Sequence, residues 1–183
     1  LAYSLTARTR HGAEDFFFRS AASAGALYPT EMYMAARGVN GLEDGLYHFA
    51  IADHGLTPLR RGTGGAGGTT SLTFYLTAIF FRSAWKYRER SYRYHLLDTG
   101  HVIESLTLAL RAMDLPFSLT YDFDDGAANR FLGLDEEREV VLAVCRMPGG
   151  EAIGEDFGGL PENCPEASRA SAPAMSEGGF LDG

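Results

Sequence analysis

A single lysine stands in the segment 82–101 (RSAWKYRERSYRYHLLDTGH), although the chain contains fifteen arginines. Lys86 lies between Trp85 and Tyr87, and the segment gathers five of the sixteen basic residues among four aromatic ones. An arginine stays protonated at any working pH, whereas burial can bring a lysine into the range of proton transfer. Lys86 is therefore a candidate proton acceptor. The alternative is a lysine left on a solvated surface of an arginine-rich chain.

A run of small residues, SAGALYP at residues 23–29, is the second candidate for ligand binding. Small side chains let a ligand approach the backbone closely, and Pro29 ends the local structure before a strand. A plain turn into that strand is the alternative. The glycine-rich run GTGGAGG at residues 62–68 is no phosphate loop of the Walker type, because residues 69–71 (TTS) follow it without the required lysine. We interpret this run as a flexible linker.

Other spacings of ionisable residues support neither a metal site nor a hydrolase. Asp98, His101 and Glu104 share one predicted helix, but about 240° of rotation separates the first from the third and no second histidine stands at i+4. Local ion pairing and hydrogen bonding explain them. The acidic run 122–125 lacks the acid that a calcium loop needs where Gly133 stands, so we interpret it as helix capping. No spacing indicates a catalytic triad.

The composition is that of one globular domain. The 183 residues carry a formal net charge of −8 and a pI of about 5.1, so the basic segment suits a compact anionic ligand and not a nucleic acid. No apolar run approaches the roughly 18 residues of a membrane span and no signal peptide is recognised, so we expect a cytoplasmic protein without membrane contact. Cys145 and Cys164 are expected to be free thiols.

Hydrophobic periodicity divides residues 31–146 into alternating short strands and helices, the pattern of an α+β or α/β domain. The expected strands are 31–37, 46–51, 72–81, 117–121 and 138–146, and the expected helices run from about 91 to 115 and from about 126 to 132. The composition then changes, so residues 148–183 are expected to be a Gly/Pro/Ser-rich tail or linker arm. Because the chain opens at Leu1 in mid-pattern, we expect the domain 1–147 to be truncated at its N-terminus.

Several separated motifs resemble the SagB/ThcOx-type branch of the FMN-dependent nitroreductase family. They are FFFRSAASAGALYPTEMYM, GLYHF, RSAWKYRERSYRYHLLDTGHVIESL, DFDD and NRFLGLD, and together they span roughly residues 15–147 in the family's order. The resemblance implies an α+β nitroreductase-like fold, in which helices, one of them long and buried, flank a mixed but mainly antiparallel sheet. It also implies FMN held at a two-fold or pseudo-two-fold interface, with redox chemistry at flavin N5.

The resemblance implies a set of site residues as well. Lys86 and Tyr87 match the Lys-Tyr pair that takes part in proton removal in this branch. The residues that would line the FMN at the start of the domain are Arg19, Ser20, Ser23, Ala24 and Gly25. Gly100 would leave space beside the ring. The loop whose backbone N–H approaches N5 corresponds to Tyr121, Asp122 and Phe123.

The activity implied is that of an FMN-dependent oxidoreductase, a SagB-type dehydrogenase that oxidises azolines of a peptide to azoles, working as a homodimer or against a sister nitroreductase-like domain. Two alternatives stay open. No Arg-x-Ser-x-Arg element stands near the start, and residues 62–68 are shorter than the family's usual insert. These departures favour a catalytically degenerate scaffold for dimerisation or peptide binding. The other alternative is a reductase of small nitro compounds or quinones that uses NAD(P)H and needs no lysine base.

Overall fold

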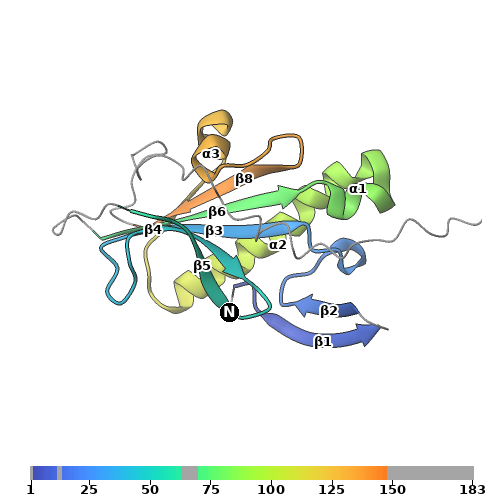
Figure 1. Cartoon of the computed structure of the whole chain (residues 1–183), viewed down its shortest axis with the longest axis horizontal. Coiled ribbons are helices and arrows are strands. Elements are labelled where there is room, and N and C mark those ends of the chain that lie inside the picture. The colour runs from blue at the N-terminus through green and yellow to red at the C-terminus, as the bar shows by residue number, and fades with distance from the viewer. Residues whose placement is uncertain (1, 12–13, 63–69, 148–183) are drawn as a thin grey trace, which may run out of the picture.

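The computed structural model describes residues 2–11, 14–62 and 70–147, and in this part of the chain two antiparallel sheets combine with helices (Figure 1). The smaller sheet is a hairpin of β1 (Leu5–His11) and β2 (Glu14–Arg19). The larger sheet has the strand order β5-β4-β3-β6-β8-β7, and every neighbouring pair in it is antiparallel. The predicted α+β fold, with a mainly antiparallel sheet and one long helix, is confirmed.

The strands of the larger sheet lie close to the expected segments. They are β3 (Thr30–Arg37), β4 (Gly45–Ala50), β5 (Gly55–Arg61), β6 (Ser71–Ile79), β7 (Ser118–Thr120) and β8 (Glu139–Arg146). All residues of β3 except Arg37 are buried, because this central strand has neighbours at both edges and packing on both faces. β4 and β5, which follow each other in the chain, form an antiparallel hairpin.

Two helices cover opposite faces of the larger sheet. The long helix α2 (Ser91–Ala112) buries Leu106 and its apolar neighbours against Met32 of β3. The short helix α3 (Asp125–Leu132) packs instead in a cluster with Tyr33. Because Met32 and Tyr33 are adjacent in one strand, their side chains point to opposite faces of the sheet. α2 and α3 therefore lie on opposite sides, as Figure 1 shows.

The ends of α3 follow the sequence closely. The side chain of Asp124 accepts a hydrogen bond from the backbone N–H of Ala127 at 2.8 Å, which satisfies one of the free donors at the first turn. Gly133 closes the helix with a φ of 73°, in the left-handed region that glycine adopts without strain. The helix capping predicted from the acidic run 122–125 is confirmed.

Three local elements differ from the predicted ones. The β1–β2 hairpin was not expected, because its side chains are largely exposed and lack a clear apolar alternation. A helix, α1 (Phe81–Tyr87), begins where strand 72–81 was expected to continue, since an unbroken apolar run does not mark its own change of conformation. The long helix ends at Ala112, followed by Asp114 with a φ of 54°, before the expected residue 115.

Some sequence predictions lie outside the described residues. These are the linker 62–68 apart from Gly62, the arm 148–183, and Cys164. Cys145 is a free thiol in β8, and burial raises its pKa to about 11. Of the helices in the described ranges, none has the length and apolarity to cross a bilayer.

Candidate functional site

The loop between the hairpin and β3 has an unusual backbone. It contains a 3-10 turn, η1 (Ala24–Ala26), and a series of residues in the left-handed region: Gly25 at φ 63°, Ala26 at 55° and Tyr28 at 48°. A residue other than glycine pays about 1–2 kcal/mol for this conformation. Two such residues within three positions persist only where other contacts hold them. The loop 23–28 is therefore a strained segment that its surroundings must fix.

Asp98 of α2 fixes the start of this loop. Its buried carboxylate accepts a hydrogen bond from the Ser23 hydroxyl at 2.6 Å and from the Ala24 backbone N–H at 3.1 Å. The Ser23 oxygen in turn accepts the backbone N–H of Tyr28 at 2.8 Å, which closes the loop on itself. The expected local pairing covers only part of the contacts of Asp98: it interacts electrostatically with His95 one turn earlier on α2, but its hydrogen-bond partners lie about 75 residues earlier in the chain.

Lys86 and Tyr87, in the last turn of α1, converge on Gly25. A Cβ placed on Gly25 would lie 2.7 Å from the Tyr87 hydroxyl oxygen and 2.9 Å from the Lys86 Nζ. Lys86 Nζ also stands 5.5 Å from the centre of the Tyr87 ring, and that ring packs on Tyr94 with centroids 4.4 Å apart. The structure thus brings an amine, a phenol and a bare backbone segment together. The Lys86 side chain is exposed in this chain, so the burial expected of it would have to come from a ligand or a partner.

Arg82, one helical turn before Lys86, anchors α1 to the other end of the loop. Its guanidinium donates to the backbone carbonyl of Tyr28 at 3.0 Å and makes a very short contact with the carboxylate of Glu31. Both contacts of the Arg82 guanidinium are charge-assisted hydrogen bonds, which are stronger than neutral ones. Arg82 therefore ties the helix that carries Lys86 and Tyr87 to the loop that they face.

Glu31 is the centre of a buried charge cluster. It is 4 % exposed in β3, and Arg82, the His48 imidazole at 2.7 Å and Arg19 at 3.7 Å surround it. Burial would raise the pKa of this carboxyl, but the attraction of Arg82, the hydrogen bond with His48 and the attraction of Arg19 outweigh it and lower the pKa to about 2. Glu31 is therefore a buried carboxylate that stays ionised over the working pH range.

The pKa of a second, half-buried carboxyl nearby shifts in the opposite direction. Burial raises the pKa of Glu139, the first residue of β8, although hydrogen bonds from the Thr77 hydroxyl and the Tyr33 hydroxyl act in the other direction. The two carboxyls differ because Glu31 contacts cations directly, whereas Glu139 is held by neutral hydroxyl donors. Glu31 therefore supplies the fixed negative charge of the cluster.

Two other residues predicted to bind the cofactor, Arg19 and Ser20, contact partners other than Gly25. Arg19 turns inward, where it donates to the Tyr3 hydroxyl at 2.5 Å and to the carbonyl of Thr30 at 3.1 Å. The Ser20 hydroxyl accepts from the backbone N–H of Ser4 at 3.0 Å. Arg19 is the last residue of β2 and belongs to the Glu31 cluster, and Ser20 follows it directly.

Gly100 and the Tyr121–Phe123 segment lie on different sides of the sheet. Gly100 is exposed on α2, and a Cβ placed there would have no atom within 4 Å. Phe123 packs in the cluster on the α3 face, and the Asp122 backbone N–H is engaged by the Thr120 hydroxyl at 3.0 Å. Tyr121 is 65 % exposed. Among the described residues, Lys86, Tyr87 and Gly25 therefore lie together. Gly100 and residues 121–123 lie apart from them.

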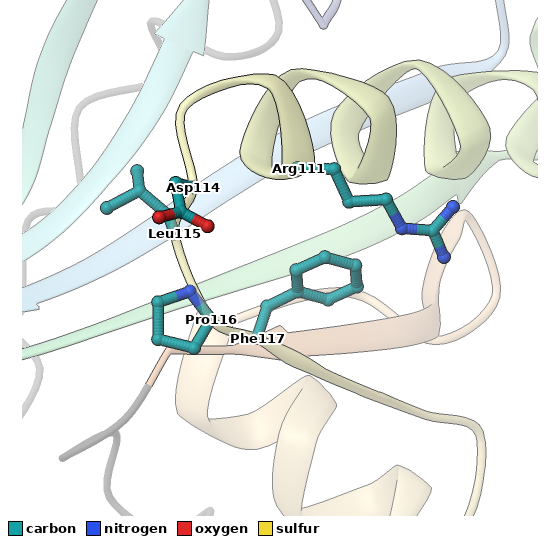
Figure 2. A pocket seen from close by; sticks show the side chains of 5 residues that line it. All are labelled: Arg111, Asp114, Leu115, Pro116 and Phe117. Atoms are coloured by element: carbon teal, nitrogen blue, oxygen red, sulfur yellow. The ribbon is translucent and has the colours of Figure 1, made fainter.

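An open pocket lies at the far end of α2 (Figure 2). It has a volume of about 570 Å³ and is lined by Arg111, Asp114, Leu115, Pro116 and Phe117. The Arg111 guanidinium lies 5.7 Å from the centre of the Phe117 ring. The sequence did not indicate this pocket, and its lining is largely solvent-exposed, so it lacks the buried polar groups that orient a ligand.

Sequence reasoning missed the residues that hold the site. Glu31 stands in a strand, EMYMAAR, that was expected to be buried, and a buried acid needs a cationic partner. That rule could have identified Glu31 as part of an ion cluster. It could not have identified Arg82 as the partner, because the two residues are 51 positions apart.

The nitroreductase family model matches residues 5–149, which is most of the chain. The chain belongs to the nitroreductase family. The Trifolitoxin-processing protein TfxB of Rhizobium leguminosarum bv. trifolii is 28% identical over 138 residues, covering 67% of this chain and 37% of TfxB. The chain thus spans little more than a third of that relative.

Two solved structures show the same fold. A "putative nitroreductase" from Anabaena variabilis has a TM-score of 0.70 and 33% identity, over 79% of this chain and 32% of its own length. A chain of the E. coli microcin synthetase McbBCD complex, solved with truncated pro-MccB17 bound, has a TM-score of 0.62 and 21% identity, over 82% of this chain and 60% of its own. This chain corresponds to part of each of these proteins.

The Glu31 cluster generates a prediction about acid stability. The pKa of Glu31 is about 2 in the folded chain against an ordinary 4.5, so its charge stabilises the fold above pH 4.5 and loses this effect as the pH falls toward 2. Glu31→Gln should lower the free energy of unfolding at pH 7 by about 3 kcal/mol, and the loss should shrink below pH 4.5. Urea unfolding at steps from pH 7 to pH 3 measures this difference.

Glu43→Gln is the matched control for this experiment. Glu43 pairs with Arg61 at 3.1 Å, but both side chains are about two-thirds exposed or more. An exposed pair contributes about 1 kcal/mol or less. A constant gap between wild type and Glu31→Gln across the whole pH range would show that Glu31 is not the group that titrates.

Proposed function

We propose that this chain is an FMN-dependent oxidoreductase in which Lys86 and Tyr87 handle protons beside the flavin. The observation that carries the proposal is their convergence on Gly25, with the Tyr87 hydroxyl and the Lys86 amine both within 3 Å of the position that a Cβ would take. A side chain at Gly25 would collide with these two groups, so the glycine is what lets them approach the backbone here. The sequence thus keeps an amine, a hydroxyl and an open backbone segment in one place.

The residues present suit the ring of FMN. Ser23, Ala24 and Gly25 present backbone and small side chains, and a flat ring could approach them closely once the flexible end of Lys86 moves away from Gly25. Once Lys86 has accepted a proton, its positive charge at the same place favours electron-rich states of a ring bound there. FMN, when bound, supplies the redox chemistry of the reaction. The chain's own part is to hold the ring and to position the groups that move protons.

Lys86 is suited to accept a proton and Tyr87 to orient the group that loses it. The amine is exposed in the isolated chain, so a bound ring and substrate would be the first elements to remove it from water. Loss of water favours the uncharged amine, which is the form that accepts a proton. The Tyr87 hydroxyl stands at the same Gly25 position and can donate a hydrogen bond to the substrate.

The proposed substrate is a peptide that carries an azoline ring. TfxB, the relative described above, is a trifolitoxin-processing protein, and this supports a role in peptide modification. Oxidation of an azoline to an azole removes two electrons and two protons, so it needs a redox cofactor together with a base. Lys86 and the flavin would provide these two functions. The SagB-type dehydrogenase activity is therefore the specific form of the proposal.

A two-fold partner, either a second copy or a sister domain, is proposed to cover the outer face of α1 and α2. Large apolar side chains are exposed along it: Phe81 (69 %), Trp85 (38 %), Tyr92 (68 %), Leu96 (46 %), Leu97 (61 %) and Leu108 (54 %). Gly100 belongs to the exposed surface of the same helix. An apolar surface of this extent indicates a protein contact. A partner there would also shield Lys86 from water.

One observation favours the alternative of a catalytically degenerate scaffold. Arg19, the cation predicted for the cofactor, is already engaged by Tyr3, Thr30 and Glu31. Its guanidinium also packs over the rings of Tyr3 and Tyr28 at 4.9 and 5.3 Å. If these contacts persist, Arg19 has little freedom to bind a phosphate. FMN affinity therefore decides between the enzyme and the scaffold.

A Lys86 series tests the enzymatic role. We expect the purified chain to bind FMN with a dissociation constant in the micromolar range or tighter, measured by quenching of flavin fluorescence. Lys86→Ala and Lys86→Arg should both keep this affinity within a few-fold and lower kcat for azoline oxidation by about 100-fold to 10,000-fold, because neither side chain accepts a proton at neutral pH. Arg90→Ala, a nearby exposed residue, is the matched control and should leave kcat unchanged.

Two results would contradict this proposal. Absence of FMN binding at micromolar protein would remove the enzymatic function of this chain and favour the scaffold. Full activity of Lys86→Ala toward nitro compounds or quinones with NAD(P)H, together with no azoline oxidation by wild type, would favour the simple reductase.

The partner surface is tested by a charge on α2. Leu97→Glu should shift the chain from twice its mass of 19.9 kDa to the monomer in sedimentation at micromolar concentration, because a carboxylate cannot be buried at an apolar contact without a large cost. Leu56→Glu, on the outer strand β5, is the control and should not change the mass. A wild-type chain that stays monomeric at high concentration would exclude the homodimer and leave the sister domain as the partner.

A further inference from the structure

Asp98 is an unusual residue for the buried face of a helix. It is 4 % exposed in α2, near apolar residues such as Val102 that belong to the core. A buried carboxylate costs several kcal/mol unless donors satisfy it. Its donors are a hydroxyl and a peptide N–H, and both come from the loop 23–28 rather than from α2. The position of Asp98 is therefore explained by the loop that it binds.

The hydrogen bonds of Asp98 have a defined direction. An ionised carboxylate only accepts, so the Ser23 hydroxyl must donate to it, and the lone pairs of Ser23 are left for the backbone N–H of Tyr28. An asparagine at this position would offer an NH2 group in place of one acceptor. The asparagine oxygen could then accept from only one of the two positions, so either the Ser23 hydroxyl or the Ala24 backbone N–H would face the NH2 group in place of a carboxylate oxygen. The charge of Asp98, and not only its shape, thus fixes both ends of the strained segment.

Gly25 lies inside the segment that these bonds close. Asp98 and Ser23 hold Ala24 on one side of it and Tyr28 on the other. The backbone at Gly25 faces Lys86 and Tyr87 at contact distance, so a small change in the loop changes the space between them. The segment that places the Gly25 backbone against Lys86 and Tyr87 is thus bonded to α2 through Asp98.

We propose that Asp98 is a positioning residue, which acts through Ser23 to set the separation between the Gly25 backbone and the side chains of Lys86 and Tyr87. The inference rests on the proposed function for its consequence in catalysis, but its structural part concerns this chain alone. A misplacement on the order of 1 Å can lower a rate by about 100-fold. Asp98 would therefore influence kcat without contacting substrate or cofactor.

The test uses the fact that Lys86 is the only lysine of the chain. Reductive methylation with 13C-formaldehyde labels its Nζ, and the dimethyl-lysine signal in a carbon NMR spectrum then reports the surroundings of Lys86, separately from the labelled N-terminus. The measurement needs neither FMN nor substrate. We expect Asp98→Asn and Ser23→Ala each to shift this signal while the chain remains folded by circular dichroism.

Two matched variants should leave the signal in its wild-type position. Ser23→Thr keeps the hydroxyl, and the extended backbone of residue 23 (φ −145°, ψ 139°) accepts a β-branched side chain. Glu104→Gln changes another acid of α2, which is exposed and lies outside the loop contacts. With FMN bound and an azoline peptide as substrate, kcat should fall by about 10-fold to 100-fold in Asp98→Asn and Ser23→Ala and stay unchanged in Glu104→Gln.

The outcomes separate this inference from the proposed function. A Lys86 signal that stays unchanged in folded Ser23→Ala overturns the positioning role, and Asp98 then only satisfies buried donors of the loop. If Asp98→Asn does not fold, Ser23→Ala and Ser23→Thr still decide the question. A signal that shifts in Ser23→Ala and recovers in Ser23→Thr supports the positioning role even if the chain binds no FMN, in which case the proposed function alone fails.

Discussion

A single buried carboxylate joins the parts of this chain that form the candidate site. Glu31 of β3 contacts Arg19 from the hairpin, His48 from β4 and Arg82 from α1. A buried ion pair offsets its loss of water only when its geometry is close, and removing one partner of such a pair is strongly destabilising. Removal of the charge would leave two guanidinium groups without their shared acceptor. The geometry of the site thus depends on a residue that does not line it.

Two restraints, of different kinds, act on the loop 23–28. At one end of the loop, Arg82 binds both Glu31 and the carbonyl of Tyr28. At the other end, Asp98 accepts hydrogen bonds from Ser23 and Ala24. Together they offset the strain of the left-handed residues in the loop. The same Arg82 fixes α1, and with it the position of the amine and the phenol. A site on a loop becomes as rigid as the helices on each side of it, which suits a reaction that depends on precise orientation.

Much of the fold could be predicted from the sequence, because it follows from local patterns. Apolar runs located β3, β6 and β8, helical spacing located α2, and the acids before α3 indicated its cap. The hairpin could not be predicted, because cross-strand pairing forms it and its own side chains are mostly exposed. The resemblance placed Lys86, Tyr87 and Gly25 in one site, and the structure brings them together. The partners of Glu31 and Asp98 stayed hidden, since each contact joins residues at least about twelve positions apart, which no local pattern encodes.

Hydrogen exchange of Glu31→Gln under strongly native conditions tests the central claim most directly. If Glu31 holds the loop and α1 in place, amides of residues 23–28 and 81–87 should exchange at least about tenfold faster than in wild type, because local opening of these segments becomes easier. Amides of α3, which packs on the opposite side of the sheet from α2, should keep their wild-type protection. Unchanged exchange at residues 81–87, or an equal increase in every element, would contradict the account.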